Sequence, residues 1–482
     1  MINMETIWKA AHALRGYTNA NEYKDFILPL IFYKYLSLKI QGTLTGNLSD
    51  AGVVYTYREA CEAADCGTEP AKAILGRTVN NLGYYIRPDD LYCEIVKKSE
   101  EGNYSYINLE SAFFRLTESL EQVTGSDYFS DLLKISRIND RVLQELIKVV
   151  DEFDLHPGED DLGSEYMKLI NLFASTSGRK DGEYYTPDCI CELIAGIIRT
   201  HFDKIESLSD PACGSGALLM KICRNVNVKE IYGNDVNSSA IKMVKLNTIL
   251  NDLDYRKTEY LLKDTLLDTS ENIYQVQVSN PPFSLRWKPV TNKKYPIPAP
   301  AVYADLAFVE HMVYHMGEMA VCILPVGVLY RKGQEKKIRE WLMAQNLVDT
   351  VMLLAGNFFY NTATPVAVIV LKKNRVDKKI LFIDGSDIFT KERGCAYLSE
   401  MQVNSLLKIY RERIESEISV LRERDEVIEG NLYIRVIHKE KHDYLDYREL
   451  SARIYVKMHN VDRLERLIRQ EVEKHGENLH VG

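Results

Sequence analysis

Hydrophobic positions recur along this chain with two different periods, and the change of period divides it into three parts. Residues 1–160 contain apolar runs with helical spacing, separated by loops rich in Gly, Asn and Asp. Residues 161–395 alternate short apolar runs with amphipathic segments, which predicts strands followed by helices. Residues 396–482 are highly charged. The helical-looking runs of the first part are 27–38, 130–138 and 141–153, and the predicted strands of the second are 274–278, 319–324, 350–354, 366–371 and 380–383.

The predicted strands of the second part are mostly apolar, as expected for strands that are covered on both faces. They therefore predict a mostly parallel sheet flanked by helices, which is an α/β fold. The runs 366–371 and 380–383 lie too close together for a helical crossover between parallel strands. We expect at least one antiparallel pair at the edge of the sheet.

The charged C-terminal part, 396–482, is predicted to be helical. Two segments carry the pattern, 401–424 and 461–474. The second has an apolar stripe at helical spacing, formed by Val461, Leu464, Leu467, Ile468 and Val472. Such a stripe can pack on its own domain or bind a partner, and the pattern alone does not choose between them.

Composition narrows the class of protein. A chain of 482 residues with 46% apolar residues is long enough for two or three globular domains. The cysteines lack the spacing of a zinc site, since Cys61 and Cys66 lie five positions apart and Cys189 and Cys191 two. We therefore expect reduced thiols and no bound metal. Residues 1–5 do not begin a signal sequence, and no run of about 18 apolar residues occurs, so we expect a cytoplasmic protein without membrane contact.

A glycine-rich turn is predicted between a strand and a helix. Asp210 ends the strand, Gly214, Ser215 and Gly216 form the turn, and the apolar run 217–220 begins the helix. Glycines at such a turn let the backbone approach a ligand closely. The turn has two glycines and lacks the third of the dinucleotide fingerprint, so by itself it is also compatible with an ordinary tight connection.

Two further acids follow the next two apolar runs. Asp235 lies 25 positions after Asp210, a spacing that suits a carboxylate accepting hydrogen bonds from a ribose. Asp264 ends the run after that, and residues 238–251 between them have the pattern of a crossover helix. Each acid alone is more often a helix cap or a surface residue. Three acids at successive strand ends favour a cofactor with a ribose.

The four residues Asn280, Pro281, Pro282 and Phe283 carry a second chemical pattern. An aromatic exocyclic amine is a poor nucleophile, so a site that alkylates it needs hydrogen-bond acceptors for its two N–H bonds. The Asn280 side-chain oxygen and the Pro281 carbonyl are such acceptors, and Pro282 restricts the backbone that presents them. Phe283 offers a flat face for a base. The alternative is an Asn-Pro turn at a strand end.

Taken together, these motifs resemble those of the modification (methyltransferase) subunits of type I DNA restriction-modification systems, within the N6-adenine DNA methyltransferases. Residues 8–38 resemble the helical N-terminal domain of that family, and 182–187 its Gly-x-aromatic-aromatic-Thr-Pro stretch. Later matches occur at 305–311, 324–329 and 359–365. The resemblance implies an S-adenosylmethionine-dependent methyltransferase fold, Rossmann-like with an antiparallel edge pair, between a helical N-terminal domain and a helical C-terminal tail.

The same resemblance implies where S-adenosylmethionine binds. Asp235 would hold the ribose and Asp264 the adenine, while Asp210 lies near the methionine end. Asp235 stands where relatives often have Glu, and the residue after the Thr-Pro is acidic where a basic one is common. The implied cofactor residues are Glu183, Tyr184, Tyr185, Thr186, Pro187, Asp188, Asp210, Gly214, Ser215, Gly216, Asp235 and Asp264, and the implied catalytic residues are Asn280, Pro281, Pro282 and Phe283.

The expected reaction is direct methyl transfer to N6 of an adenine turned out of the duplex, stacked on Phe283 and held by Asn280 and Pro281. Cytosine C5 methylation is disfavoured, since it uses a cysteine that usually follows Pro and the chain has no Pro-Cys pair. Methylation of cytosine N4 remains open because it presents the same kind of amine. A stand-alone DNA methyltransferase, an RNA or protein-glutamine methyltransferase, and a subunit without turnover also remain.

Net charge bears on the partners. The chain has 60 basic and 69 acidic residues, a net charge of −9, whereas a protein that binds DNA alone usually has a basic surface. A basic cluster, Arg286, Lys288, Lys293 and Lys294, is either a phosphate contact or a solvated loop. The resemblance implies that two copies of the chain bind double-stranded DNA with one DNA-specificity subunit, that a restriction nuclease-translocase subunit can join them, and that the C-terminal helices contact the specificity subunit. The DNA sequence recognised does not follow.

Overall fold

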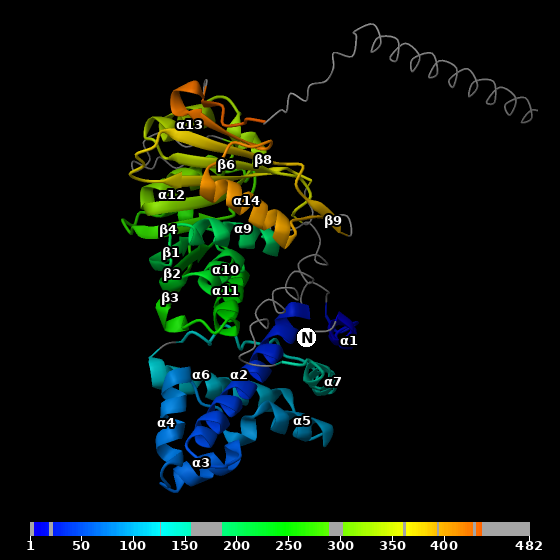
Figure 1. The fold of residues 1–482 in the computed structure, drawn as a ribbon. Helices are drawn as coiled ribbons and strands as arrows, with labels where there is room; N and C mark the ends of the chain where they lie inside the picture. Colours follow the sequence, from blue (N-terminus) through cyan, green and yellow to red (C-terminus); the bar gives the residue numbers. More distant parts are fainter. Residues whose placement is uncertain are drawn as a thin grey trace, which may run out of the picture. The chain divides into compact units, whose positions relative to one another are not determined.

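The computed structural model describes residues 4–18, 23–125, 127–155, 186–288, 302–359, 363–392, 395–427 and 430–435. The chain divides into two compact units, Met1–Ile434 and Arg435–Gly482. Nearly all described residues belong to the first unit, in which Figure 1 shows N-terminal helices followed by a sheet with helices on both faces. The predicted helix at 461–474 lies outside the described residues.

The N-terminal part is helical, as its apolar spacing predicted. The predicted run 27–38 lies inside the long helix α2, and its apolar side chains are mostly buried. Helix α3 begins with a capping box, in which the Glu59 N–H donates to the Thr56 side chain and the Thr56 N–H donates to the Glu59 carboxylate. The bounds are α1 Met4–Ala13, α2 Tyr23–Asp50, α3 Tyr57–Asp65, α4 Ala71–Leu82, η2 Pro88–Asp90, α5 Tyr92–Glu100, α6 Tyr106–Thr124 and α7 Asp140–Asp151.

The helix predicted at 130–138 is absent, and that prediction was wrong. These residues form turns and extended backbone between α6 and α7. The apolar side chains that suggested a helix are buried all the same, Leu132 and Ile138 among them. Two backbone carbonyls of this segment accept hydrogen bonds from tyrosines. The Tyr106 hydroxyl donates to the Ile135 carbonyl at 3.1 Å, and the Tyr17 hydroxyl to the Arg137 carbonyl at 2.8 Å.

The described residues of the second part form a mixed sheet of nine strands in the order β11-β8-β6-β7-β5-β4-β1-β2-β3. The strands β3, β2, β1, β4 and β5 are parallel to one another, as are β6 and β8. All five predicted strands are present. The bounds are β1 Lys204–Asp210, β2 Asn227–Asp235, β3 Thr258–Leu262, β4 Tyr274–Ser279, β5 Met316–Pro325, β6 Val348–Leu354, β7 Val366–Lys372, β8 Lys379–Gly385 and β11 Ser419–Glu423, with β9 Thr390–Glu392 and β10 Cys395–Tyr397 in a separate hairpin.

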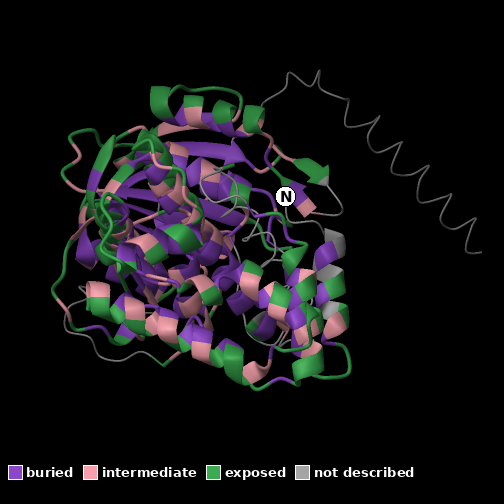
Figure 2. Cartoon of the chain, turned by 90° about the horizontal axis from the view of Figure 1, so that it is seen from below, coloured by how far each residue is buried: buried purple, intermediate pink, exposed green. Residues whose placement is uncertain are grey.

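Helices cover both faces of the sheet, which explains why strands β5 to β8 are mostly apolar. In β5, Val321 and Ile323 pack in the core shared with α9, α10, α11 and α14, whereas Cys322 and Leu324 pack in the core shared with α12 and α13. Figure 2 shows buried residues along the strands and exposed ones on the outer sides of helices. The bounds are α9 Asp188–Arg199, α10 Ala217–Asn225, α11 Ser238–Leu250, η3 Tyr255–Lys257, η4 Thr265–Leu267, α12 Asp305–His315, η5 Val326–Leu329, α13 Gln334–Ala344, α14 Glu400–Glu412 and η6 Arg424–Glu426.

The sheet has an antiparallel edge pair, as predicted. The two runs that suggested it, now β7 and β8, do not form that pair. Strands β7 and β8 do run in opposite directions, yet β6 lies between them, so they are not neighbours. The reversed strand β7 is inserted between β5 and β6 and is antiparallel to both. The edge pair is formed by β8 and β11. Proximity in sequence gave the direction of β7 and β8 correctly and their pairing incorrectly.

The sheet continues past residue 395. Residues 401–424, predicted as one helix, form the helix α14, a turn and the edge strand β11. Helix α14 packs against α9 and β8, where the Leu407 side chain lies so close to Gly196 that a Cβ there would approach it to 2.4 Å. The division of the chain into three parts at 160 and 395 stays a proposal. The sheet itself extends beyond 395, as far as Glu423 in β11.

The N-terminal helices contact the catalytic sheet through α11 and the turn that follows it. The Tyr35 hydroxyl donates to Asp252 at 2.8 Å, and Lys39 forms an ion pair with the same carboxylate. The Tyr128 hydroxyl donates to the Lys245 carbonyl at 3.4 Å. Buried apolar residues of both parts belong to one continuous core.

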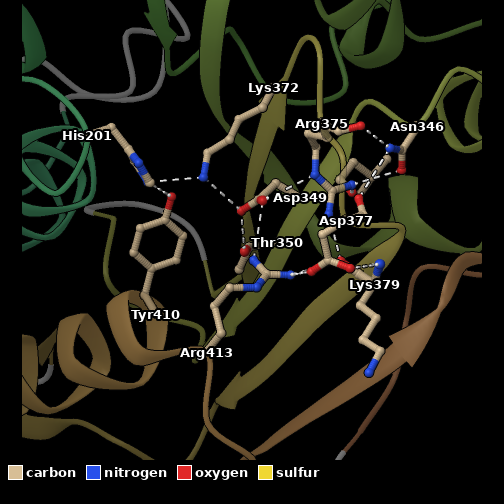
Figure 3. A network of polar contacts seen from close by, with 11 residues as sticks. His201, Asn346, Asp349, Thr350, Lys372, Arg375, Asp377, Lys379, Tyr410 and Arg413 are labelled. Atoms are coloured by element: carbon tan, nitrogen blue, oxygen red, sulfur yellow. Dashed lines mark hydrogen bonds and ion pairs between the residues drawn. The ribbon is translucent and has the colours of Figure 1, made fainter.

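A buried ion network joins the far strands of the sheet to α14 (Figure 3). At its centre the Asp349 carboxylate meets Lys372, Arg375 and Arg413 at 3.3, 3.3 and 3.2 Å. The Lys372 ammonium also donates to His201 Nε2 at 3.0 Å. Burial, and then the Lys372 charge, lowers the pKa of His201 to about 4, so the neutral ring can accept this hydrogen bond.

Candidate active site

The first acid of the site, Asp210, ends β1 and is buried. Its carboxylate accepts hydrogen bonds from the Ala212 N–H and the Ser279 hydroxyl, both at 2.9 Å. Burial raises the pKa of Asp210 to about 7, which those two hydrogen bonds only partly offset. Ser279 is the last residue of β4 and directly precedes Asn280, so this contact connects the two predicted motifs.

The second acid, Asp235, ends β2 and holds the glycine turn in place. One carboxylate oxygen accepts the Gly214 N–H at 2.9 Å, and the other accepts the Asn237 N–H at 2.8 Å. Burial raises the pKa of Asp235, and these backbone hydrogen bonds act in the opposite direction. Each oxygen keeps a lone pair that a ligand hydroxyl could use.

The glycine turn needs its glycines for two different reasons. Gly216 caps α10 with φ 79°, and a Cβ there would lie 2.5 Å from Val244 of α11. Gly216 is therefore required for packing between α10 and α11. Gly214 also has positive φ, 51°, but a Cβ there would meet nothing within 4 Å. The backbone at Gly214 thus borders open space.

Asn280 follows β4 and is oriented by a residue from the stretch before α9. Its side-chain Nδ2 donates to Thr186 Oγ1 at 3.0 Å, and both residues are buried. In this arrangement the Nδ2 end of the amide faces the Thr186 hydroxyl, which accepts its hydrogen bond. The Oδ1 end of Asn280 must then point away from Thr186.

The segment after Asn280 is anchored to α12. The Ser284 N–H donates to Asp305 at 2.8 Å, and Asp305 is fully buried beside Arg331 at 3.1 Å. Phe283, just before this anchor, is half-buried and lies edge-on to Phe359 with ring centroids 5.3 Å apart. The edge-on contact with Phe359 restricts the orientation of the Phe283 ring.

One cavity of about 500 Å³ lies at the carboxyl ends of β1, β2, β3 and β4. This is where open α/β sheets bind their ligands. Polar groups enter it from all three acids, and apolar side chains form much of the rest. It is lined by Thr186, Asp210, Pro211, Ala212, Cys213, Gly214, Ser215, Ala217, Leu218, Asp235, Val236, Asn237, Ala240, Met243, Lys263, Asp264, Thr265, Leu266, Asn280, Pro282, Leu285, Trp287 and Phe308.

Some predicted residues do not line this cavity. Asp188 lies on α9, largely exposed, and pairs with Lys221 at 2.8 Å. Gly216 acts through packing on α11. Pro187, Pro281 and Phe283 are also absent from the lining. Glu183, Tyr184 and Tyr185 lie outside the described residues, so their predicted contacts remain predictions.

Sequence reasoning missed several lining residues. Lys263 and Leu266 flank Asp264, and extending that motif by two residues in each direction would have included them. Trp287 lies between Arg286 and Lys288 of the basic cluster, and it packs against the apolar cluster that contains Leu266 and Phe308. No spacing rule marks Met243, which reaches the cavity because its helix, α11, follows β2.

Among the described residues, no helix combines the length and the apolar character needed to cross a membrane.

Comparison with known proteins gives consistent matches along the chain. Residues 158–443 match the family model described as N-6 DNA Methylase, and residues 4–150 match the HsdM N-terminal domain. The type I restriction enzyme MpnII methylase subunit of Mycoplasma pneumoniae is 30% identical, with 95% of this chain and 92% of that protein covered. The MjaVII methylase subunit of Methanocaldococcus jannaschii is 27% identical, with 76% and 71% covered.

A solved structure agrees with these relatives. The type I restriction-modification system methyltransferase subunit from Streptococcus thermophilus superimposes with a TM-score of 0.76 at 27% identity, covering 89% of this chain and 97% of that one. The motifs, the mixed methyltransferase sheet and the family matches agree. The chain belongs to the N-6 DNA methylase family, as a modification subunit of the type I restriction-modification kind and an adenine-specific DNA methyltransferase.

Proposed function

We propose that this chain takes the methyl group from S-adenosylmethionine and transfers it to N6 of an adenine turned out of double-stranded DNA. The observation that carries the proposal is the single cavity that brings Asp210, Asp235 and Asp264 together with Asn280. An acid at each of three neighbouring strand ends suits the amine, ribose and adenine of one cofactor. An amide at the fourth strand end suits the amine that receives the methyl group.

The cavity fits this cofactor in size and chemistry. Its volume of about 500 Å³ lies in the range of small-molecule sites. The open space beside Gly214 gives the cofactor room next to the backbone, and the apolar side chains of Met243 and Leu266 can cover an adenine ring. When bound, the cofactor supplies an electrophilic methyl group on a sulfonium sulfur.

The role we assign to Asn280 follows from its contact with Thr186. Because Nδ2 donates to the Thr186 hydroxyl, the Oδ1 end is presented as an acceptor for an N–H of the target amine. The Pro281 carbonyl would accept the second N–H. Both contacts strengthen as the nitrogen gains positive charge during transfer, which lowers the barrier. Phe283 would stack on the base.

Asp210 would bind the amino-acid part of the cofactor, and Asp235 would bind its ribose. Among the described residues, no lysine or arginine contacts the buried Asp210 carboxyl, so a ligand ammonium group would compensate its charge. Asp235 would accept ribose hydroxyls with the lone pairs that its backbone contacts leave. Asp264 would meet the adenine, beside Leu266.

We further propose that DNA recognition comes from a partner. The net charge of −9 argues against strong DNA binding by this chain alone. We expect two copies to assemble with one specificity subunit, joined at times by a restriction subunit. The apolar stripe 461–472 is our candidate for the contact with the specificity subunit.

The purified chain should therefore bind S-adenosylmethionine but show weak, strongly salt-dependent DNA binding and little site-specific methylation. With its specificity subunit, methylation should become site-specific, and truncation at residue 455 should reduce assembly more than cofactor binding. Mass analysis of DNA from cells with and without the gene measures the product. N6-methyladenine supports the proposal, N4-methylcytosine would correct the base, and a methylated RNA or protein with unmodified DNA would overturn it.

A further inference from the structure

Three buried side chains that the proposed reaction does not use lie together beside the cavity wall. Asp268 follows η4, and His311 and His315 lie four residues apart on one face of α12. Each offers a ligand atom, and these atoms all lie within 4.8 Å of one another. Their exposed fractions are 6%, 3% and 1%. Two imidazoles and a carboxylate are a ligand set that transition metals use.

The His315 ring is held in a defined tautomer. Its Nδ1 lies 2.6 Å from the Asn272 carbonyl oxygen, and against a carbonyl this nitrogen must be the donor. The lone pair of the ring is then on Nε2, at the opposite edge. A backbone carbonyl that fixes the second nitrogen of a histidine is the usual support of a metal-binding imidazole.

The Asp268 carboxylate is also oriented by its neighbours. Its Oδ1 accepts the Ser270 N–H at 2.8 Å and contacts the Lys263 ammonium at 2.5 Å, whereas its Oδ2 accepts the Ser270 hydroxyl at 3.0 Å. Oδ2 therefore keeps a lone pair for a further donor or an ion. The ammonium of Lys263 already supplies a positive charge at this position. Its side chain is 35% exposed, so it can turn toward solvent if another cation arrives.

We propose that Asp268, His311 and His315 form a binding site for a divalent transition metal, with Zn²⁺ as the best fit. The earlier expectation of no metal considered only cysteine spacing and did not consider histidines. Zn²⁺ accepts two imidazoles and one carboxylate, with water or another group as the fourth ligand. Mg²⁺ prefers oxygen ligands and is disfavoured. With bonds of about 2.1 Å, tetrahedral ligands lie about 3.4 Å apart, so the cluster contracts modestly on binding.

The ion would brace one wall of the cavity. Helix α12 contributes Phe308 to the lining, and the segment before Asp268 contributes Lys263 to Leu266. A metal that bridges α12 to Asp268 fixes both. This consequence rests on the proposed cofactor site, but the metal site itself does not.

The first test measures metal binding by the untagged full-length chain after treatment with a chelator. Equilibrium dialysis with elemental analysis should find one Zn²⁺ whose affinity falls by about 100-fold or more in His311→Gln and in His315→Gln, and by roughly 10-fold in Ser270→Ala. His12→Gln is the control, since His12 is exposed on α1 outside the cluster. Binding of Zn²⁺ that is equal in all four variants overturns the site.

The second test begins with the unmodified chain, so its first measurement does not depend on how well a variant folds. Zn²⁺ should raise the melting temperature of the unmodified chain, a chelator should reverse the rise, and Mg²⁺ at the same concentration should not produce it. Lys263→Met should tighten Zn²⁺ binding by roughly 10-fold, because it removes a like charge from the site. If Zn²⁺ leaves the melting temperature unchanged and Lys263→Met does not alter the affinity for Zn²⁺, the three side chains form a hydrogen-bonded cluster without a metal. Calorimetry of cofactor binding, done separately, keeps this result distinct from any failure of the proposed reaction.

Discussion

Two buried aspartates of one sheet have pKa values shifted in opposite directions. Asp349, in β6, is surrounded by Lys372, Arg375 and Arg413. Burial alone would raise the pKa of Asp349, but these three cations lower it below its usual value. Asp210, at the end of β1, accepts hydrogen bonds from a hydroxyl and a backbone N–H and contacts no cation among the described residues, and burial raises its pKa to about 7.

The difference separates a structural carboxylate from one that we propose binds a ligand. The charge of Asp349 is compensated within the protein, so nothing further is needed there. The charge of Asp210 is not, and it borders a cavity that could admit a compensating cation. Burial of an acid therefore says little about function until its partners are counted.

The largest expected effect is on stability and comes from removing Asp349. Asp349→Ala leaves three cations without their shared carboxylate, and we expect a loss of about 3–5 kcal/mol in the free energy of unfolding. Asp377→Ala is the control, because Asp377 contacts the same Arg413 at 3.6 Å but is 54% exposed. It should cost less than about 1 kcal/mol. Denaturant unfolding measures both, and equal losses would contradict the assignment.

On the binding side, Asn280→Ala removes an acceptor that acts mainly in the transition state. Methyl transfer should fall by about 100-fold or more in kcat, with little change in cofactor affinity. Asn280→Asp keeps oxygen acceptors and should retain more activity than the alanine variant. Single-turnover kinetics with the specificity subunit present would show this, and a fully active Asn280→Ala enzyme rules out the proposed role.

Asp235→Ala should weaken cofactor binding by about 1.5–3 kcal/mol, the size of a hydrogen bond to a charged group. Asp235→Asn is the matched variant, because it keeps one oxygen acceptor for the turn at Gly214. Calorimetry on folded protein measures the affinities. If neither variant differs from the unmodified chain, the ribose is held elsewhere.

The smallest effect is a pH dependence from Asp210. The folded-state pKa is raised from 3.8 to about 7, so the stability that the protonated carboxyl contributes is full below about pH 4 and is lost as pH rises through 7. A cationic ligand favours the carboxylate, so cofactor affinity should fall by at most tenfold per pH unit below 7. Asp210→Asn should abolish this dependence. Calorimetry from pH 6 to 8 checks it, and a variant with an unchanged pH profile assigns the titration to another group.

Local sequence patterns predicted the positions of the strands along the chain well, but not which strands are neighbours in the sheet. Apolar runs located β4 to β8, because strands covered on both faces leave a continuous signal. The pairing of β7 between β5 and β6 depends on contacts between distant segments, which no local pattern contains. The short strand β11 was hidden in a charged segment, because an edge strand needs few apolar residues.

The candidate site was predictable where chemistry is tied to strand ends. Asp210, Asp235, Asp264 and Asn280 all reach the cavity, because parallel strands bring their carboxyl ends to one side. Asp188 was assigned from its place in a motif, and its side chain turns to Lys221 on α10 instead. The direction of a side chain on the first turn of a helix depends on its neighbours in space, which the motif does not specify.

Helix α11 connects the N-terminal helices mechanically to the cavity. Its first half lines the cavity through Ala240 and Met243, and its far end is held by Tyr128 and, just beyond it, by Tyr35. A helix of this length transmits displacement as a stiff rod, since its backbone hydrogen bonds resist bending. A shift of the N-terminal helices would therefore move the α11 side chains that line the cavity and change its width.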